Sequence, residues 1–178
     1  TAVALGDMDN DGDLDAYVGN GSGQADEVWR NDGTGTFTDS GQTLGHRATW
    51  AVALGDVDAD GDLDAFVANV RYAGVSARGN RVWLNNGAGT FTISGQNLGD
   101  ADSLSVALGD VDGDGDLDAF VGNSNGLYQT NKLYLNQPNA PIPDADLFYV
   151  AQGSPELSLN VLVNDWDPDG DAISVTAV

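Results

Sequence analysis

The feature that most constrains this chain is an aspartate-rich stretch that occurs three times, each time between two short apolar runs. Successive copies start 49 and then 54 residues apart, as counted from their first aspartates. The copies are VALGDMDNDGDLDAYVGN (3–20), VALGDVDADGDLDAFVAN (52–69) and VALGDVDGDGDLDAFVGN (106–123). Repeats of about 50 residues are typical of propellers, solenoids and arrays. The chain is therefore expected to build one supersecondary unit three times.

The strands of one unit are clearest in the second copy. The run WAVALGD (50–56) predicts a strand that is buried on both faces, and the alternation over 63–67 predicts a half-buried strand. A third strand is expected at 82–84. The turn sequence NNGAGT then leads into a fourth strand at 91–93. Four short antiparallel strands at this period indicate a propeller blade.

The other two units follow the same plan, but the third ends early. The first unit repeats the pattern with strands near 28–30 and 37–38, whereas QPNAPIP replaces the turn and the fourth strand after 133–136. We therefore predict an all-β partial β-propeller of three four-stranded blades, at about 1–48, 49–101 and 102–137. Propellers usually have four to eight blades. Thr1 begins inside the first repeat, so either further blades lie upstream or the sheets stack incompletely. A strand from the upstream side would complete the third blade.

Each aspartate-rich loop places carboxylates at alternate positions. If the first Asp is position 1, Asp stands at positions 1, 3, 5, 7 and 9 and Gly at position 6. Like charges a few ångströms apart repel by roughly 4 kcal/mol per pair at an effective dielectric constant near 20. Calcium takes 6 to 8 oxygen ligands, and the glycine permits the turn that brings position 9 back. The loops are therefore predicted to bind Ca²⁺.

We assign the side chains at positions 1, 3, 5 and 9 as ligands, together with the backbone carbonyl at position 7, whose side chain is expected to point outward. Three ions are predicted, about one per blade. Magnesium is disfavoured because it demands octahedral geometry and usually keeps its waters. The assigned residues are Asp7, Asp9, Asp11, Asp13 and Asp15; Asp56, Asp58, Asp60, Asp62 and Asp64; and Asp110, Asp112, Asp114, Asp116 and Asp118.

Other interpretations of these loops are disfavoured. An EF-hand needs a Glu at position 12, where this chain has Val18, Val67 or Val121. Solvated acidic turns without an ion do not explain three copies in one register. A catalytic carboxylate pair needs a general acid with a raised pKa, which calcium-ligating aspartates lack. His46, the single histidine, has no nucleophile motif around it, so we expect a structural or surface role and no enzymatic activity in this segment.

Composition limits the partners of the chain. The formal net charge is -22, from 28 acidic and 6 basic residues, which disfavours binding to nucleic acid and to anionic lipids. No apolar run approaches the 18 residues of a membrane span. The absence of cysteine excludes disulfides and thiolate metal sites.

The pattern DxDxDGDLD between an apolar strand and an aromatic-bearing strand, with NNGAGTF downstream, resembles the FG-GAP or VCBS-type repeat over residues 1 to about 136. The resemblance implies integrin-like β-propeller blades with one calcium ion per loop on one face. It also implies an adhesion or protein-interaction role in a large secreted or surface bacterial protein. Some such blades accompany enzymes, so an accessory segment of an extracellular lyase or hydrolase stays an alternative.

Aromatic residues occupy the same place in each unit, at Trp29, Trp83 and Tyr134. Core packing between blades is the favoured interpretation. The alternative is a carbohydrate-binding module, in which Trp29, Trp83 or the loop at 70–79 would contact a sugar. The ligand, protein or glycan, stays open at this stage.

The remaining residues predict a second domain. Three prolines at 138–146 indicate a linker, and alternating apolar residues from Leu157 to Val163 indicate a strand. NDWDPDGD resembles the start of a bacterial cadherin-like or Ig-like domain, so 147–178 is expected to be a truncated β-sandwich, which would neighbour the blades. A fourth calcium ion or a plain Asp-Pro turn is expected at Asp165, Asp167, Asp169 and Asp171.

Overall fold

The computed structural model describes residues 1–71, 79–124 and 130–136. The chain divides into two units, Thr1–Asn136 and Gln137–Val178. The predicted linker (138–146), the predicted cadherin-like or Ig-like segment (147–178) and its four aspartates lie outside the described residues. They stay predictions.

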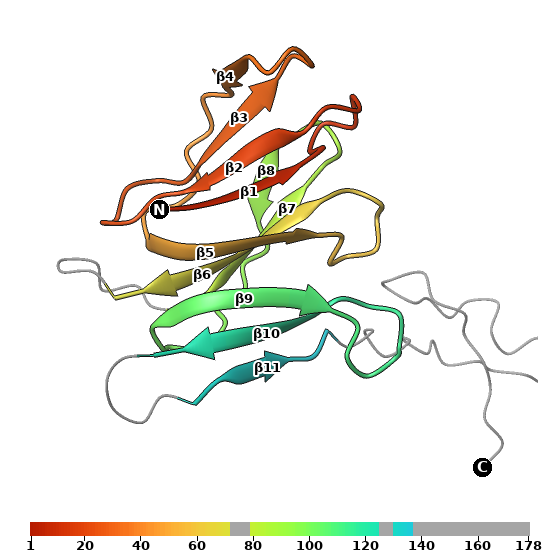
Figure 1. The fold of residues 1–178 in the computed structure, drawn as a ribbon. Helices are drawn as coiled ribbons and strands as arrows, with labels where there is room; N and C mark the ends of the chain where they lie inside the picture. Colours follow the sequence, from red (N-terminus) through yellow and green to blue (C-terminus); the bar gives the residue numbers. More distant parts are fainter. Residues whose placement is uncertain (72–78, 125–129, 137–178) are drawn as a thin grey trace, which may run out of the picture. The chain divides into compact units, whose positions relative to one another are not determined.

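The described residues form three antiparallel sheets and no helix (Figure 1). In each sheet, consecutive strands pair with one another in chain order. The first sheet contains β1 (Ala2–Gly6), β2 (Asp15–Gly19), β3 (Glu27–Asn31) and β4 (Phe37–Asp39). The second contains β5 (Ala48–Gly55), β6 (Asp64–Val70), β7 (Arg81–Asn85) and β8 (Phe91–Ile93). The third contains β9 (Ser103–Gly109), β10 (Asp118–Asn123) and β11 (Lys132–Tyr134).

The all-β prediction is thus confirmed, with four strands in the first and second sheets. The third sheet has three strands among the described residues, as the early loss of the turn sequence suggested. Each aspartate-rich loop joins the first strand of a sheet to the second. The turns at 31–36 and 85–90 join the third strand to the fourth, as predicted from the turn sequences NDGTGT and NNGAGT.

Two hydrophobic cores hold the sheets together. The first core lies between the first and second sheets and includes Tyr17, Val67 and Phe91, with the Tyr17 and Phe91 rings edge to face at 5.7 Å. The second lies between the second and third sheets. Trp83 packs against the first core and Tyr134 against the second, so core packing between sheets is confirmed for these two aromatic residues.

Two predictions about strand burial are wrong. The strand after the second loop was expected to be half-buried, but β6 is buried from Asp64 to Asn69 because a neighbouring sheet covers each of its faces. The preceding strand was expected to be buried on both faces, yet Trp50 in β5 is 53% exposed. The pairing of β5 with β6 shifts register between Thr49 and Ala51, and this irregularity turns Trp50 outward.

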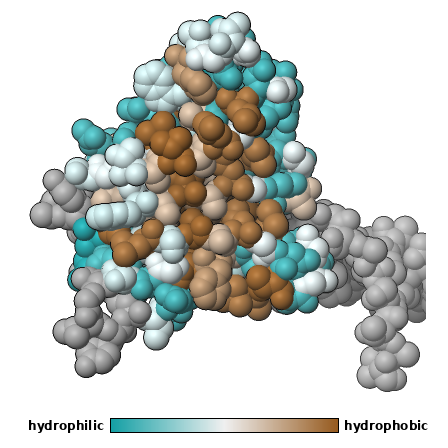
Figure 2. All heavy atoms as spheres, viewed as in Figure 1, coloured by the Kyte–Doolittle hydropathy of each residue, from teal (hydrophilic) through white to brown (hydrophobic). Residues whose placement is uncertain are grey.

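The first strands of the three sheets, β1, β5 and β9, contact one another in succession. Figure 2 shows apolar side chains gathered in a band over these strands, with polar side chains on either side. Val3, Leu5 and Leu104 are among the exposed members of β1 and β9. This band is the largest apolar surface in the view.

Candidate metal centres

The structure brings together three carboxylates in each aspartate-rich loop, at positions 1, 3 and 9. Within each group, one oxygen from every carboxylate lies within 4.8 Å of the others. Carboxylate oxygens at this spacing are the ligands that a hard cation such as Ca²⁺ prefers. The three groups, each of which could hold a metal ion, are Asp7, Asp9 and Asp15; Asp56, Asp58 and Asp64; and Asp110, Asp112 and Asp118.

The aspartate at position 9 is the buried anchor of each loop. It is the first residue of the second strand, and its carboxylate accepts two backbone N–H groups, one from position 2 of the loop and one from an asparagine at or just after the end of the third strand. Both oxygens are therefore fixed before any ion binds. The pairs are Met8 and Asn31 on Asp15 (3.2 and 2.8 Å), Val57 and Asn85 on Asp64 (3.0 and 2.8 Å), and Val111 and Asn136 on Asp118 (2.9 and 2.8 Å).

The aspartate at position 1 shapes the turn. Asp7 accepts the N–H groups of Asp11 (3.1 Å) and Gly12 (3.0 Å), and Asp56 does the same in the second loop. Gly12 has a φ of 95°, in the region that only glycine enters without strain. The predicted role of the glycine at position 6 is therefore confirmed.

The aspartates at positions 5 and 7 are arranged differently from the other three. At position 5, Asp11 accepts the N–H of Asp13 at 2.9 Å and lies outside the three-carboxylate group of its loop. At position 7, Asp62 lies outside the three-carboxylate group of its loop, and its carboxylate accepts a hydrogen bond from the Asn10 side chain at 2.8 Å. Asp13 likewise lies over Gly33 in the β3–β4 turn. The side chains of Asp13 and Asp62 thus lie against the turns that contain Gly33 and Gly87.

Burial and repulsion between neighbouring carboxylates raise the free energy of the ionised aspartates in these clusters. Burial raises the pKa of Asp64 to about 6 although two backbone N–H groups oppose the shift. Burial, and then repulsion from Asp15 and Asp11, raises the pKa of Asp9. One oxygen of Asp9, Oδ1, is buried with no hydrogen-bond partner among the described residues. Such an oxygen is costly without a partner, and a cation would provide one.

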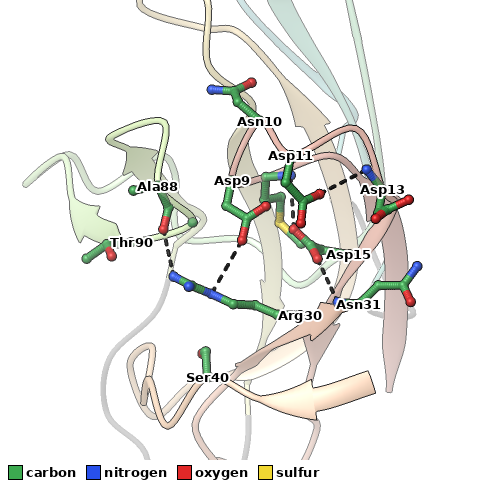
Figure 3. Close-up of polar contacts among 12 residues, drawn as sticks. Asp9, Asn10, Asp11, Asp13, Asp15, Arg30, Asn31, Ser40, Ala88 and Thr90 are labelled. Atoms are coloured by element: carbon green, nitrogen blue, oxygen red, sulfur yellow. Dashed lines mark hydrogen bonds and ion pairs between the residues drawn. The ribbon is translucent and has the colours of Figure 1, made fainter. Parts of the chain in front are cut away.

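The first cluster also contains a basic neighbour (Figure 3). Arg30 in β3 lies between the first loop and the second sheet: its Nε is 3.8 Å from Asp9 Oδ2, and its Nη2 donates to the Ala88 carbonyl at 2.7 Å. Leucine occupies the matching place in the other two sheets, at Leu84 and Leu135. The first loop is therefore partly neutralised by the protein itself.

Sequence reasoning missed one set of residues, the asparagines at or just after the ends of the third strands. Asn85 Nδ2 donates to the carbonyl of Met8 (2.8 Å), and Asn136 Nδ2 donates to the carbonyl of Val57 (2.7 Å). Each asparagine thus ties its own sheet to the aspartate-rich loop of the preceding sheet. These residues could have been found from the sequence, because Asn31, Asn85 and Asn136 occupy the same position in each repeat. Their role in a turn had seemed to explain that position.

His46 is exposed at the surface, in agreement with the prediction. The described residues contain no helix long and apolar enough to cross a lipid bilayer.

A family model described as an FG-GAP-like repeat matches residues 2–67 and 69–121. No curated protein matches the chain.

Proposed function

From the premise that this chain belongs to the FG-GAP-like repeat family, we propose that it is a non-catalytic adhesion or protein-interaction module whose three loops each hold a structural calcium ion. The observation that carries the calcium proposal is the buried, unpartnered Oδ1 of Asp9 within a group of three carboxylates. Repetition of the same group in all three loops supports it. Calcium would supply positive charge to all three loops, of which the first also has a basic side chain, Arg30, beside it.

The residues present fit such an ion. The carboxylates at positions 1, 3 and 9 already converge, and position 9 is held by two N–H groups. We propose that the carboxylate at position 5 and the carbonyl at position 7 complete the shell of each site. Extracellular calcium modules bind in the range of about 0.1 to 1 mM. Sites of that strength would be filled outside a cell, so we place the module in a secreted or surface protein.

We further propose that the three sheets are part of a β-propeller. The supporting contact occurs twice: a Cβ built on Gly6 would lie 2.8 Å from Leu63 Cδ1, in the loop between β5 and β6, and 2.9 Å from Leu54 Cδ1, in β5. Leu117 and Leu108 of the third sheet cover Gly55 at the same two distances. Gly109 is the equivalent glycine at the end of β9 in the third sheet. A Cβ built on Gly109 would have no described atom within 4 Å.

Two sheet faces are therefore left without this contact. On the first sheet, Leu5 and Leu14 occupy the places of the covering leucines and are 58% and 54% exposed. On the third sheet, Phe120 is 51% exposed, whereas Phe66 at the same place in the second sheet is only 2% exposed. Further sheets of the same kind would bury both faces, as neighbouring sheets do here.

The test of the calcium proposal is chelation. The thermal melt of the chain in 2 mM calcium is compared with the melt after EDTA and with the melt in 2 mM magnesium. Calcium should raise the melting temperature and magnesium should not replace it, since at 2 mM calcium a site with a dissociation constant of about 0.1 to 1 mM adds roughly 0.6 to 1.8 kcal/mol. Isothermal titration should show about three ions per chain.

A pair of variants gives this experiment its control. Asp58→Asn removes a position-3 ligand and should lower the stoichiometry by one. Asp39→Asn changes an exposed carboxylate in β4, outside the clusters, and should leave it unchanged. An unchanged melt after EDTA, together with no bound calcium at millimolar concentration, would refute the proposal.

A further inference from the structure

A cavity of about 370 Å³ lies between the first and second sheets, away from the aspartate-rich loops. Those loops join the end of β1 to β2 and the end of β5 to β6. The cavity residues lie at the opposite strand ends: Thr49 is the second residue of β5, Asn69 lies near the end of β6, and Arg81 begins β7. This volume is within the range of small-molecule sites. The cavity is therefore a separate site from the metal centres.

Positive charge is concentrated at this cavity in an otherwise acidic chain. The chain has only 6 basic residues, and two of them, Arg47 and Arg81, line the cavity. Burial, and then repulsion from Arg81, lowers the pKa of Arg47. Arg47 donates to the Gly79 carbonyl at 2.6 Å, and Arg81 donates to the Gln96 carbonyl. Two guanidinium groups held close together favour an anion, above all a carboxylate or phosphate.

The other side of the cavity has a buried hydrogen-bond chain that ends in an unpartnered acceptor. Asn69 Nδ2 donates to Thr49 Oγ1 at 3.0 Å, and that hydroxyl donates to Asp26 Oδ2 at 2.8 Å. Asn69 is 1% exposed, and its Oδ1 has no hydrogen-bond partner among the described residues. An acceptor of this kind calls for a hydroxyl or amine donor.

The matching place between the second and third sheets lacks these features. There Asn123 Oδ1 accepts the Ser103 hydroxyl at 2.7 Å, so the acceptor that is unpartnered in Asn69 is satisfied. Ala101 stands in the place of Arg47, and Lys132 in the place of Arg81. The repeat does not require the arginine pair, which is specific to the cavity between the first two sheets.

We propose that this cavity binds a sugar that carries a carboxylate, of the hexuronate class. Its carboxylate pairs with Arg47 and Arg81, a hydroxyl donates to Asn69, and the apolar face of the ring packs on Trp83, which lines the same cavity. A neutral sugar offers no carboxylate to the guanidinium groups, and a simple carboxylate offers neither a ring face to Trp83 nor a hydroxyl to Asn69. The inference deepens the proposed interaction function, on which it rests, by naming a ligand class.

The test uses glucuronate as the probe, with glucose and acetate as comparisons, on the full chain in 1 mM calcium. Calorimetry should show that glucuronate binds at least about tenfold more tightly than glucose or acetate. Amide NMR shifts on titration should centre on the cavity residues Gly45, Asn69 and Gly95. The NMR arm needs no variant, so it keeps the proposal testable even if a substitution prevents folding.

Variants then assign the contacts. Arg81→Gln should weaken glucuronate binding about 10- to 100-fold, the usual loss for a charge-assisted pair, and leave glucose unaffected. Lys132→Gln, at the matching place in the third sheet, should leave glucuronate binding unchanged. If glucose bound as tightly as glucuronate, recognition of the carboxylate would be refuted. If acetate bound as tightly, recognition of the sugar ring would be refuted. If no NMR shifts occurred at the cavity residues, the location of the site would be refuted. None of these outcomes changes the chelation result, so the calcium proposal is judged separately.

Discussion

Replacing Asp26 by asparagine should change how the stability of this chain depends on pH. Asp26 is 2% exposed, and its carboxylate accepts hydrogen bonds from the Asn20 backbone (2.7 Å), the Thr49 hydroxyl (2.8 Å) and the Tyr17 hydroxyl (3.4 Å). Burial outweighs these donors and raises the pKa of Asp26 from 3.8 to about 6. The buried carboxylate is therefore less stable, when ionised, in the folded protein than in the unfolded chain.

The size and the sign of the effect follow from this shift. A carboxyl whose pKa is raised in the folded state stabilises the fold below its unfolded pKa, and the contribution is lost as the pH rises through the folded pKa. The window for Asp26 thus runs from about pH 4 to about pH 6. A shift from 3.8 to about 6 corresponds to about 3 kcal/mol. Asp26→Asn should therefore gain about 3 kcal/mol relative to the wild-type protein between pH 4 and pH 7.5.

Urea unfolding at four pH values from 4 to 7.5, in saturating calcium, measures this difference. Asparagine fits the place, because Asn80 stands there in the second sheet and accepts the Asn69 N–H at 3.0 Å. The reciprocal change, Asn80→Asp, should produce a loss of similar size over the same pH window. Other carboxylates titrate in both proteins, so only the difference between them is interpreted. A difference that stays flat from pH 4 to 7.5 would refute the argument that burial dominates at Asp26.

Three further predictions follow from the contacts between sheets and loops. Asn85→Ala should lower the free energy of unfolding by about 2 kcal/mol in urea melts, because it leaves a buried loop carbonyl without its donor; an effect below 0.5 kcal/mol would contradict it. Arg30→Leu should tighten calcium binding at the first loop by up to about fivefold in a titration, since it removes the cation 3.8 Å from Asp9 Oδ2, and the head group of Arg30 is exposed enough that the pair is worth at most about 1 kcal/mol. Gly6→Ala should cost about 1 to 3 kcal/mol because two leucine methyl groups occupy the space, whereas Gly109→Ala, the matched control in open space, should cost nothing.

The parts of the fold that sequence could predict are those set by local patterns. Strands β7 and β8 follow from apolar runs on either side of an Asn-Gly turn, and the loops follow from a fixed spacing of Asp and Gly. Convergence of positions 1, 3 and 9 also follows from that spacing, because the glycine at position 6 reverses the chain. The family could be named from the same local patterns.

The features that could not be predicted from the sequence depend on contacts between different sheets. Asn85 looks like a turn residue in its own sequence, and only the fold brings its side chain to Met8, 77 positions earlier. In the same way β6 alternates like a half-buried strand, but a second neighbouring sheet covers the face that the pattern would leave in water. Asp62 bonds to Asn10 for the same reason. A local pattern says which side chains share a face, and the stacking of sheets then decides what covers that face.

Met8 connects the first metal centre to the core between the sheets. It lies between the ligands Asp7 and Asp9; its N–H donates to Asp15, its carbonyl accepts from Asn85, and its side chain is fully buried in the first core. Repulsion that moves Asp7 and Asp9 apart must therefore also move Met8, and a displaced Met8 opens a space in close-packed surroundings. The loop cannot relax alone. A cation in the first loop thus stabilises the packing of two sheets as well as the loop itself. In the third loop position 2 is Val111, which is 56% exposed, so this coupling is absent there in the described residues.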